Sequence, residues 1–548
     1  ACGDGPPPAE TDADATSDAG TSGAESESGT SGLTDGIEVD WSFAPVRGKA
    51  NLDDDSLGAR VDWLELPFAE DDDIVALTLP ELPPGDEVHL ALAGDVERLR
   101  VWLARPDGAS QLLVGAGNGE ATVENTLAPD TLLPPGEPVT LLFEFGRYGV
   151  RGELTLTRLV DGDEVAADAI ALEAAPLLLT DHTRPAERVW VVEVPEGCAD
   201  DEPSSEAYVQ GFLDALGPER VTVVAGEEYG CDRWLQDELE FAVSFDPDEA
   251  LLETAMDSIR DRGLDELPEQ LLGADFAHTV WGEGSANTYD YFGNLEVTPA
   301  VLTPDGEFPY GRVYYGVGGS QGPHTALRSF LEDQVVQAPL ELDSSWLCVS
   351  HVDEWISFVP DQTAPRGFRM LYGDTEEGFA ALGDVDPARA LPRYAADHGY
   401  PTVGSILEDA ALRAFNEELQ LDHLEPIRAQ LQAALALSPE EIVAVPMIFE
   451  ELGGLCSGYA TALVPGMVNL IVANFGPGDE HLLVPDPYVR EALDDQDDDP
   501  LIAAFRARMP AQLEVHFVDD WSSYHLLYGD VHCGADVERA PDFIPWWE

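Results

Sequence analysis

The hydrophobic pattern of the chain changes character near residue 185, and this change constrains the fold most. Between Ile37 and about Thr180, short runs alternate apolar and polar side chains, as in Leu99-Arg-Val-Trp-Leu and Val139-Thr-Leu-Leu-Phe-Glu-Phe. Pro-Pro-Gly and Asp-Gly turn signals separate these runs. The pattern is typical of an antiparallel β-sandwich, which we expect over residues 37–182.

From Arg188 onward, strand-like runs alternate with helical stretches. Val189-Trp-Val-Val-Glu-Val is typical of a strand, whereas Ser405 to Leu437 has helical character. The alternation predicts a mixed α/β domain over residues 183–548, and we expect the chemistry to lie there. A chain of 548 residues is also too long for one compact core, which agrees with several domains.

The N-terminal residues 1–36 contain almost no large apolar side chain, so we expect a disordered acidic tether. Ala1-Cys-Gly resembles the processing site of a bacterial lipoprotein. This predicts an exported protein, secreted or held at the cell envelope by a lipid on Cys2. The alternative is an expression artefact or a chance cysteine.

The chain is strongly acidic, with 107 Asp and Glu against 27 Lys and Arg, a formal net charge of −80. Such a charge repels phosphate backbones, argues against a nucleic-acid partner and attracts cationic ligands. The single lysine, Lys49, and the acid surplus fit a halophilic protein. No apolar run is long enough to predict a transmembrane segment.

Six cysteines are too few and too scattered for a disulfide framework or a paired zinc site. In an exported protein Cys198 could pair with Cys231, with free buried thiols as the alternative. The states of Cys348 and Cys456 are not readable from the sequence.

An acidic loop lies between the expected strands of the sandwich. Asn51, Asp53, Asp55 and Asp62 occupy positions 1, 3, 5 and 12, the spacing of calcium-binding loops. The match is partial, because position 6 is serine and position 12 is aspartate. A solvated acidic loop is the alternative.

Two short polar patterns in the second half predict a site. We expect Cys231 to Glu240 to be a strand, with Gln236, Glu238 and Glu240 on one face and Asp237 on the other. His351 and Asp353 have the same period of two and would share one cavity. A solvated face and a structural histidine are the alternatives.

Cys533 lies in Tyr528-Gly-Asp-Val-His-Cys-Gly-Ala, where the glycines favour a bent, accessible segment. A stabilised thiolate there would be a nucleophile. Because His532 would point to the opposite face, we expect a partner distant in sequence, with His351 as the candidate.

Several motifs occur in an order that resembles one family. They are Asp232-Arg-Trp-Leu-Gln-Asp-Glu-Leu-Glu240, Asp290-Tyr-Phe-Gly-Asn-Leu-Glu-Val297, His351-Val-Asp-Glu-Trp-Ile-Ser-Phe-Val-Pro360, Met467-Val-Asn469 and Gly529-Asp-Val-His-Cys-Gly534. Over residues 190–548 the chain resembles the calcium-dependent protein-arginine deiminases, and residues 51–180 more weakly resemble their immunoglobulin-like domain. The resemblance implies an α/β catalytic domain of the pentein type, a five-bladed α/β propeller.

The resemblance also implies the role of each matched residue in deimination of peptidyl-arginine to citrulline. Cys533 would attack the guanidinium and form a thiouronium intermediate, His351 would act as general acid and base, and Asp237 and Asp353 would grip the cation. The substrate contacts would come from Trp234, Arg260 and Arg262. The family carries an arginine where this chain has Leu527.

Calcium is the implied cofactor. One ion would be bound by Gln236, Glu240, Glu296 and the main-chain oxygens of Phe292 and Leu295, and another by Glu238, Asp257, Ser258 and Asp261. The implied partners are arginine-containing proteins or peptides. Two alternatives remain: a deiminase of a small free guanidine, and a calcium-binding surface lipoprotein that binds arginine-rich peptides without catalysis.

Overall fold

The described part of the computed structural model comprises residues 41–55, 61–64, 66, 73–134, 136–198, 203–451, 453 and 456–548. The predicted tether 1–36, with Cys2, lies outside these residues. The predicted domain boundary near residue 182 stays a prediction.

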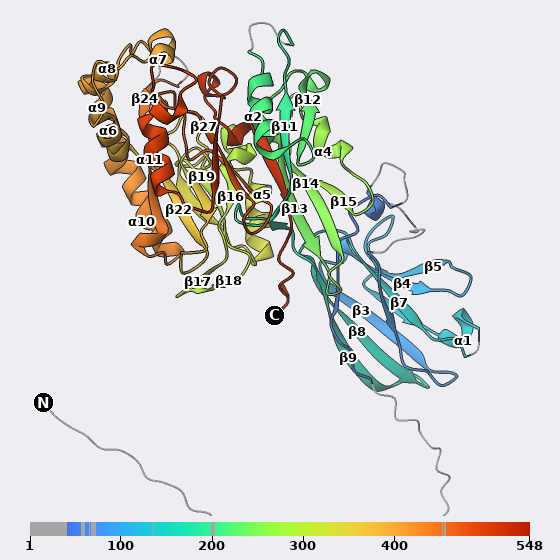
Figure 1. Cartoon of the computed structure of the whole chain (residues 1–548). Helices are drawn as coiled ribbons and strands as arrows, with labels where there is room; N and C mark the ends of the chain where they lie inside the picture. The colour runs from blue at the N-terminus through green and yellow to red at the C-terminus, as the bar shows by residue number, and fades with distance from the viewer. Residues whose placement is uncertain are drawn as a thin grey trace, which may run out of the picture. The chain divides into compact units, whose positions relative to one another are not determined.

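Two sheets contain the strands between Val46 and Ala174 (Figure 1). The strands predicted over Leu99–Leu103 and Val139–Phe145 are confirmed as β4 and β7, with buried side chains meeting across their antiparallel pairing. The first sheet has the order β1 (Val46–Gly48), β9 (Asp163–Ala174), β8 (Arg151–Val160), β3 (Glu87–Gly94) and β6 (Glu124–Leu127). The second has the order β2 (Val75–Thr78), β7 (Thr140–Phe145), β4 (Leu99–Ala104) and β5 (Ser110–Gly115).

Five further sheets repeat one local topology. In each, a central strand pairs with one antiparallel and one parallel neighbour, and a helix lies in the crossover to the parallel neighbour, as parallel pairing requires. The antiparallel, central and parallel strands are β29 (Ala535–Arg539), β11 (Ala186–Glu193) and β12 (Val221–Ala225); β13 (Leu239–Phe245), β14 (Leu251–Asp257) and β15 (Phe276–Val280); β16 (Leu295–Val297), β19 (Val313–Val317) and β20 (Leu340–Asp343); β21 (Ile356–Pro360), β22 (Phe368–Asp374) and β23 (Ile442–Pro446); and β26 (Ile471–Asn474), β27 (Glu480–Pro485) and β28 (Glu514–Val518). The second of these sheets is extended by β10 (Leu178–Leu179).

The final strand of the chain pairs with the first strand of this region. Because β29 pairs with β11, one sheet contains both the beginning and the end of the α/β part. Two hairpins, β17 (Val301–Thr303) with β18 (Gly306–Phe308) and β24 (Phe449–Glu451) with β25 (Ala460–Ala462), complete the strands. The prediction of a mixed α/β region is confirmed.

The helical character predicted for Ser405 to Leu437 is confirmed, with interruptions. Asp409 caps a new helix by accepting from the backbone N–H groups of Ala411 and Leu412. Further along, Pro426 lacks a backbone N–H, and a π-helical turn over Gln420–Leu424 precedes it. The helices are α1 (Pro129–Leu132), α2 (Glu206–Leu216), α3 (Leu235–Glu238), α4 (Glu266–Gln270), α5 (Thr325–Gln334), α6 (Thr375–Gly383), α7 (Pro392–Asp397), α8 (Val403–Leu407), α9 (Ala410–Leu419), α10 (Glu425–Ala434) and α11 (Pro500–Arg508).

These helices are short. Among the described residues, none combines the length and the apolar character needed to cross a bilayer.

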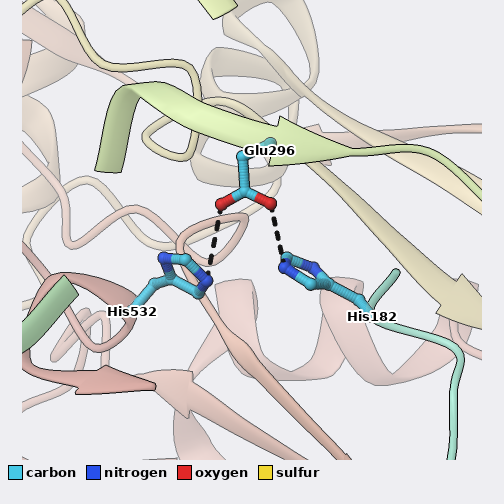
Figure 2. Close-up of side chains that lie close together, drawn as sticks. All are labelled: His182, Glu296 and His532. Carbon is cyan, nitrogen blue, oxygen red and sulfur yellow. Dashed lines mark ion pairs between the residues drawn. The ribbon is translucent and has the colours of Figure 1, made fainter. Parts of the chain in front are cut away.

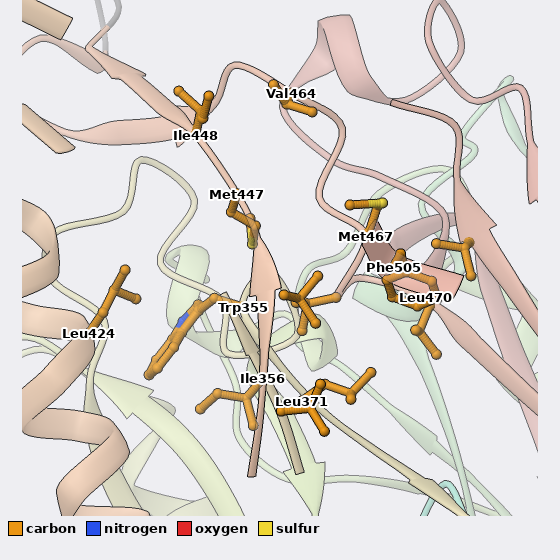
Figure 3. Close-up of a cluster of buried hydrophobic side chains, with 14 of the residues drawn as sticks. Trp355, Ile356, Leu371, Leu424, Met447, Ile448, Val464, Met467, Leu470 and Phe505 are labelled. Atoms are coloured by element: carbon orange, nitrogen blue, oxygen red, sulfur yellow. The ribbon is translucent and has the colours of Figure 1, made fainter. Parts of the chain in front are cut away.

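The largest apolar core supports the segment that carries the candidate site (Figure 3). Trp355 and Ile356, at the start of β21, pack with Met447 and Leu371, and Phe505 reaches the same core from α11. Burying each large apolar side chain contributes about 1.5–3 kcal/mol. The loop immediately before Trp355, which contains His351 and Asp353, therefore starts from a rigid base.

Two disulfides join segments next to candidate site residues. Cys198 bonds to Cys231, which resolves the alternative left open by the sequence, and Cys348 bonds to Cys456. Cys533 is the free cysteine of the described residues. Cys231 directly precedes Asp232, and Cys348 lies three residues before His351.

Removing either disulfide by a double cysteine-to-serine change should lower stability. The pairs are separated by 33 and 108 residues, and loop-closure entropy then predicts a loss on the order of 3–5 kcal/mol each, larger for Cys348–Cys456. Thermal denaturation with and without reductant measures this. Reductant should lower the melting temperature of the wild type most; a wild type insensitive to reductant would contradict the prediction.

Candidate active site

In the single helical turn α3, the side chains of three adjacent polar residues point in three different directions. The predicted strand over Cys231 to Glu240 is wrong, because Leu235–Glu238 is helical and the strand begins at Leu239. Leu235 and Leu239 are both fully buried, and a spacing of four fits a helix as well as a strand. Successive side chains on a helix turn by about 100°. Gln236, Asp237 and Glu238 therefore point to different neighbours, and the predicted shared face of Gln236 and Glu238 does not exist.

Asp237, His351 and Asp353 meet around Gly293. Asp237 Oδ1 lies 3.6 Å from His351 Nδ1. A Cβ added to Gly293 would lie 2.6 Å from His351 Nδ1, 3.3 Å from Asp353 Oδ2 and 3.4 Å from Asp237 Oδ1. Only a glycine fits there, so the three polar groups share one small space.

His351 and Asp353 reach this space from a loop and not from a strand. β21 begins only at Ile356, so the period of two that predicted a shared cavity comes from an irregular segment. His351 Nε2 lies 2.9 Å from the carbonyl oxygen of Thr288, which fixes the ring from its far side. The convergence that the sequence indicated is present, although the backbone conformation differs.

Cys533 lies in a buried 3-10 turn over His532–Gly534. The bend was predicted, but the predicted accessibility is wrong, because only 4% of the residue is exposed. The thiol donates to Asp353 Oδ2 at 3.7 Å, and Asn469 Nδ2 lies 3.5 Å from Sγ. Gly529 leaves room beside it: a Cβ there would lie 2.4 Å from the Trp234 ring and 3.2 Å from Sγ.

Burial and two carboxylates disfavour the thiolate. Burial raises the pKa of Cys533 well above its usual value, and Asp353 and Asp237 raise it further. Burial also raises the pKa of Asp237, although His351 and Arg260 oppose this shift. Arg260 Nε lies 3.9 Å from Asp237 Oδ2 on one side, and a planar cation between Asp237, Asp353 and the thiol could bind other oxygens of the two acids.

Asn469 and His532 join the cluster without having been assigned a role from the sequence. Asn469 donates to Asp353 at 3.0 Å and accepts from the backbone N–H of His532 at 2.8 Å. His532 Nδ1 lies 3.0 Å from Asp353 Oδ2. The signal for Asn469 was its place in the Met467-Val-Asn469 motif. Both residues hold Asp353 in position.

Glu296 lies between two imidazoles from distant segments (Figure 2). His182 Nε2 is 3.0 Å from one carboxylate oxygen and His532 Nε2 is 3.5 Å from the other. Burial opposes the imidazolium, but Glu296 and Asp353 outweigh it and raise the pKa of His532. His182 had no sequence signal, because it precedes Glu296 by more than 100 residues.

The first predicted calcium set contains crowded acids. Gln236 Nε2 donates to Glu240 Oε2 at 2.7 Å, and Gln236 Oε1 is buried without a hydrogen bond. Burial raises the pKa of Glu240 well above its usual range, and Asp536 and Glu296 add to the shift. Phe292 and Leu295 lie just before Glu296, at the junction with β16. Oxygen donors with excess negative charge fit a hard cation.

The second predicted set is rearranged around Asp265. Carboxylate oxygens of Glu238, Asp257 and Asp265 lie within 4.8 Å of one another, and Asp265 was not among the predicted ligands. The backbone N–H of Ser258 donates to the Glu238 carbonyl, and burial raises the pKa of Asp265, with Asp261 adding to the shift. Burial raises the pKa of Glu238 to about 8, and Glu238 Oε1 and Asp257 Oδ1 are buried without hydrogen bonds. These oxygens also fit a hard cation.

The two predicted substrate arginines differ in their surroundings. Arg260 is buried, bonds to Asp232 at 2.7 and 3.0 Å and to Glu238 at 2.8 Å, so it neutralises nearby acids. Arg262 is exposed and donates to the Tyr291 hydroxyl at 3.0 Å. Only Arg262 is placed to meet a ligand directly in this structure.

The acidic loop of the N-terminal sheets brings its aspartates together. Oxygens of Asp53, Asp55 and Asp62 lie within 4.8 Å of one another, and the backbone N–H of Asp55 donates to Asp62 at 2.8 Å. The amide of Asn51 donates to Glu144 at 3.1 Å. Ser56 lies outside the described residues.

The described geometry defines a mixed α/β protein with a buried cysteine site that faces carboxylates. A family model, "Protein-arginine deiminase (PAD)", matches residues 164–548. The chain is 32% identical to human protein-arginine deiminase type-1 over 407 residues (69% of this chain, 57% of the relative). It is 31% identical to the rat type-4 protein over 406 residues (70% and 57%) and 30% identical to the human type-3 protein over 411 residues (70% and 57%).

This chain therefore belongs to the protein-arginine deiminase family. It spans 57% of the length of these three relatives.

Proposed function

We propose that the protein is a calcium-dependent protein-arginine deiminase that hydrolyses peptidyl-arginine to peptidyl-citrulline and ammonia. The convergence of the Cys533 thiol with Asp237, Asp353 and His351 around Gly293 carries the proposal. Membership of the family supports it.

The substrate would be recognised by charge and shape. A guanidinium is planar and presents several N–H donors, so Asp237 and Asp353 can bind different edges of it. The arriving cation also offsets the negative charges that raise the pKa of Cys533, which favours the thiolate when substrate is bound. Substrate binding and nucleophile activation are thus coupled in this proposal.

The covalent step follows from that position. The Cys533 sulfur forms a bond to the central guanidinium carbon, His351 protonates the departing nitrogen, and ammonia leaves as the C–N bond breaks. A thiouronium intermediate remains on the sulfur. Water deprotonated by His351 attacks the same carbon, its oxygen becomes the urea oxygen of citrulline, and the thiolate is restored.

Calcium is the proposed cofactor because buried side-chain oxygens lack hydrogen bonds in four residues: Gln236, Glu238, Asp257 and Glu296. Burial also raises the pKa of Glu238 and of Asp257, so a cation is needed to keep these carboxylates charged. When bound, the ion would supply the positive charge that lets these acids stay ionised and packed. Because Gln236 and Glu238 flank Asp237 on α3, ordering them also fixes Asp237.

The finer architecture is part of the proposal. The repeated three-stranded topology and the closing β29–β11 pair support a five-bladed propeller of the pentein type over residues 183–548. The two sheets of β1–β9 support an immunoglobulin-like domain over residues 37–182, with a calcium loop at Asp53, Asp55 and Asp62.

We also propose an exported protein that acts on arginine-containing proteins or peptides. The disulfides Cys198–Cys231 and Cys348–Cys456 support an oxidising compartment. A lipid on Cys2, halophily and the absence of a nucleic-acid partner remain part of this proposal and rest on the sequence.

A peptide with one internal arginine and blocked termini tests the activity. With calcium, the protein should release ammonia and convert arginine to citrulline, a mass change that mass spectrometry detects; with chelator, the rate should fall at least about 100-fold, because the acidic clusters lose their counter-charge. Free arginine and agmatine are the parallel substrates. Conversion of free arginine or agmatine alone would point to a small-guanidine deiminase. Binding of the peptide without conversion of any substrate would contradict the proposed enzymatic activity.

A further inference from the structure

Two histidines and a glutamate meet on β27 and β28, apart from the candidate active site. The parallel register pairs His481 with Glu514, and His516 follows two residues later on β28, so the three side chains share one face. His481 Nδ1 lies 3.0 Å from His516 Nε2. Glu514 oxygens lie 3.8 Å from each of these nitrogens. The three ligand atoms are within 4.8 Å of one another.

His481 is oriented from its other side. Its Nε2 lies 2.9 Å from Asp479 Oδ1, and since an ionised carboxylate only accepts, Nε2 carries the proton. Arg220 binds both carboxylate oxygens of Asp479 through its two terminal guanidinium nitrogens and so holds this carboxylate behind His481. The lone pair of His481 Nδ1 therefore points toward His516 and Glu514. A carboxylate behind a histidine in this way is the usual support of a metal-binding imidazole.

We propose that His481, His516 and Glu514 bind one divalent transition metal of the zinc class, with the remaining position open to water. Two imidazole nitrogens and one carboxylate are the donor set of open zinc sites. Bonds of about 2.0–2.2 Å at tetrahedral angles place ligand atoms roughly 3.3 Å apart, close to the distances here. Glu514 closes the small remaining gap, because its side chain is 69% exposed and free to turn.

The donors differ from those of the acidic clusters. Calcium prefers oxygen ligands, whereas imidazole nitrogen selects zinc, copper or nickel. Without metal, His516 Nε2–H donates to His481 Nδ1. A metal bound at His516 Nε2 would replace this hydrogen bond, and the single proton of the neutral ring would move to Nδ1.

The metal would act as a clamp between elements. It would join β27 to β28, and the Asp479–Arg220 pair would extend this link to the residue before β12. The hydrogen bonds and ion pairs of His481, Glu514 and His516 described above do not include Cys533, so the proposed role is structural. A metal that binds the folded state alone raises the melting temperature.

Isothermal titration of the full chain with zinc chloride, in excess calcium that occupies oxygen-rich sites, tests this proposal. The wild type should bind one zinc ion more than H481A and H516A. Cobalt should give the visible absorption of a four-coordinate site in the wild type and not in H481A. Zinc should raise the melting temperature of the wild type more than that of either variant.

The control is H423A, which removes another partly exposed imidazole next to a carboxylate, Asp343; it should match the wild type. Glu514→Gln removes an exposed ligand without touching the core and should weaken zinc at least 10-fold, and Asp479→Asn should weaken it about 10–100-fold. Any zinc that binds near Cys533 binds equally to the wild type and to all variants, so it does not change the difference in zinc stoichiometry between them. Equal zinc stoichiometry and affinity in the wild type, H481A and E514Q would overturn the proposal.

Discussion

Cys533→Ala should lower turnover of a peptidyl-arginine substrate by at least about 10⁴-fold, because no other side chain of the site can form the covalent bond to the guanidinium carbon. Substrate binding should persist, since Asp237 and Asp353 remain. Because burial raises the pKa of Cys533 and keeps the thiol uncharged, its removal relieves no buried charge and leaves only a small cavity, so the variant should be folded and lose about 1 kcal/mol of stability. Initial rates, equilibrium dialysis of the peptide and thermal denaturation measure the three effects.

The matched control is the double variant Cys348→Ser/Cys456→Ser, which removes two other cysteines. It should lose stability while its active site keeps a nucleophile, so intact mass spectrometry after quenching should still detect a substrate adduct. A Cys533→Ala protein that still converts arginine would remove this residue from the proposed reaction.

The sequence predicted the architecture well where one period dominates. The short apolar runs of β4 and β7, bounded by turn signals and rich in β-branched and aromatic residues, favour strands, and both are strands in the structure, although β4 is buried along nearly its whole length. α3 was missed because the buried residues Leu235 and Leu239 are four positions apart, a spacing that fits the period of a helix and the period of a strand. Only tertiary packing decides such a case, and here it turns Asp237 away from Gln236 and Glu238.

The site was predictable through motifs and not through geometry. His351, Asp353 and Cys533 were named from the sequence, yet Cys533 is buried beside Asn469 and near Trp234, which come from other segments of the chain. Asp265 was missed because a bend between Asp257 and α4 brings it back beside Glu238. The His481–His516 pair likewise depends on strand register, which local sequence does not encode.

Asp353→Asn should have opposite effects on activity and on thiol reactivity. Asp353 loses its charge-assisted contact with the substrate guanidinium, at a cost of about 3–4 kcal/mol, so kcat/KM should fall roughly 10²–10³-fold. After burial, Asp353 is the strongest influence that raises the pKa of Cys533. Its removal lowers that pKa, increases the thiolate fraction at pH 8 and should speed alkylation by iodoacetamide in the absence of substrate.

Glu354→Gln is the matched control for the opposite effects of Asp353→Asn on turnover and on alkylation. Glu354 is the next residue and accepts from the backbone N–H of His351 at 3.2 Å, but burial raises its pKa well above the usual range. Glu354 also raises the pKa of Cys533, but less than Asp353 does, so glutamine should change both quantities much less than Asp353→Asn. If Asp353→Asn slowed both turnover and alkylation, Asp353 would act by holding the turn around Cys533 and not through its charge. If only turnover fell, the thiol would not sense this carboxylate, and substrate binding could not activate the nucleophile by neutralising it.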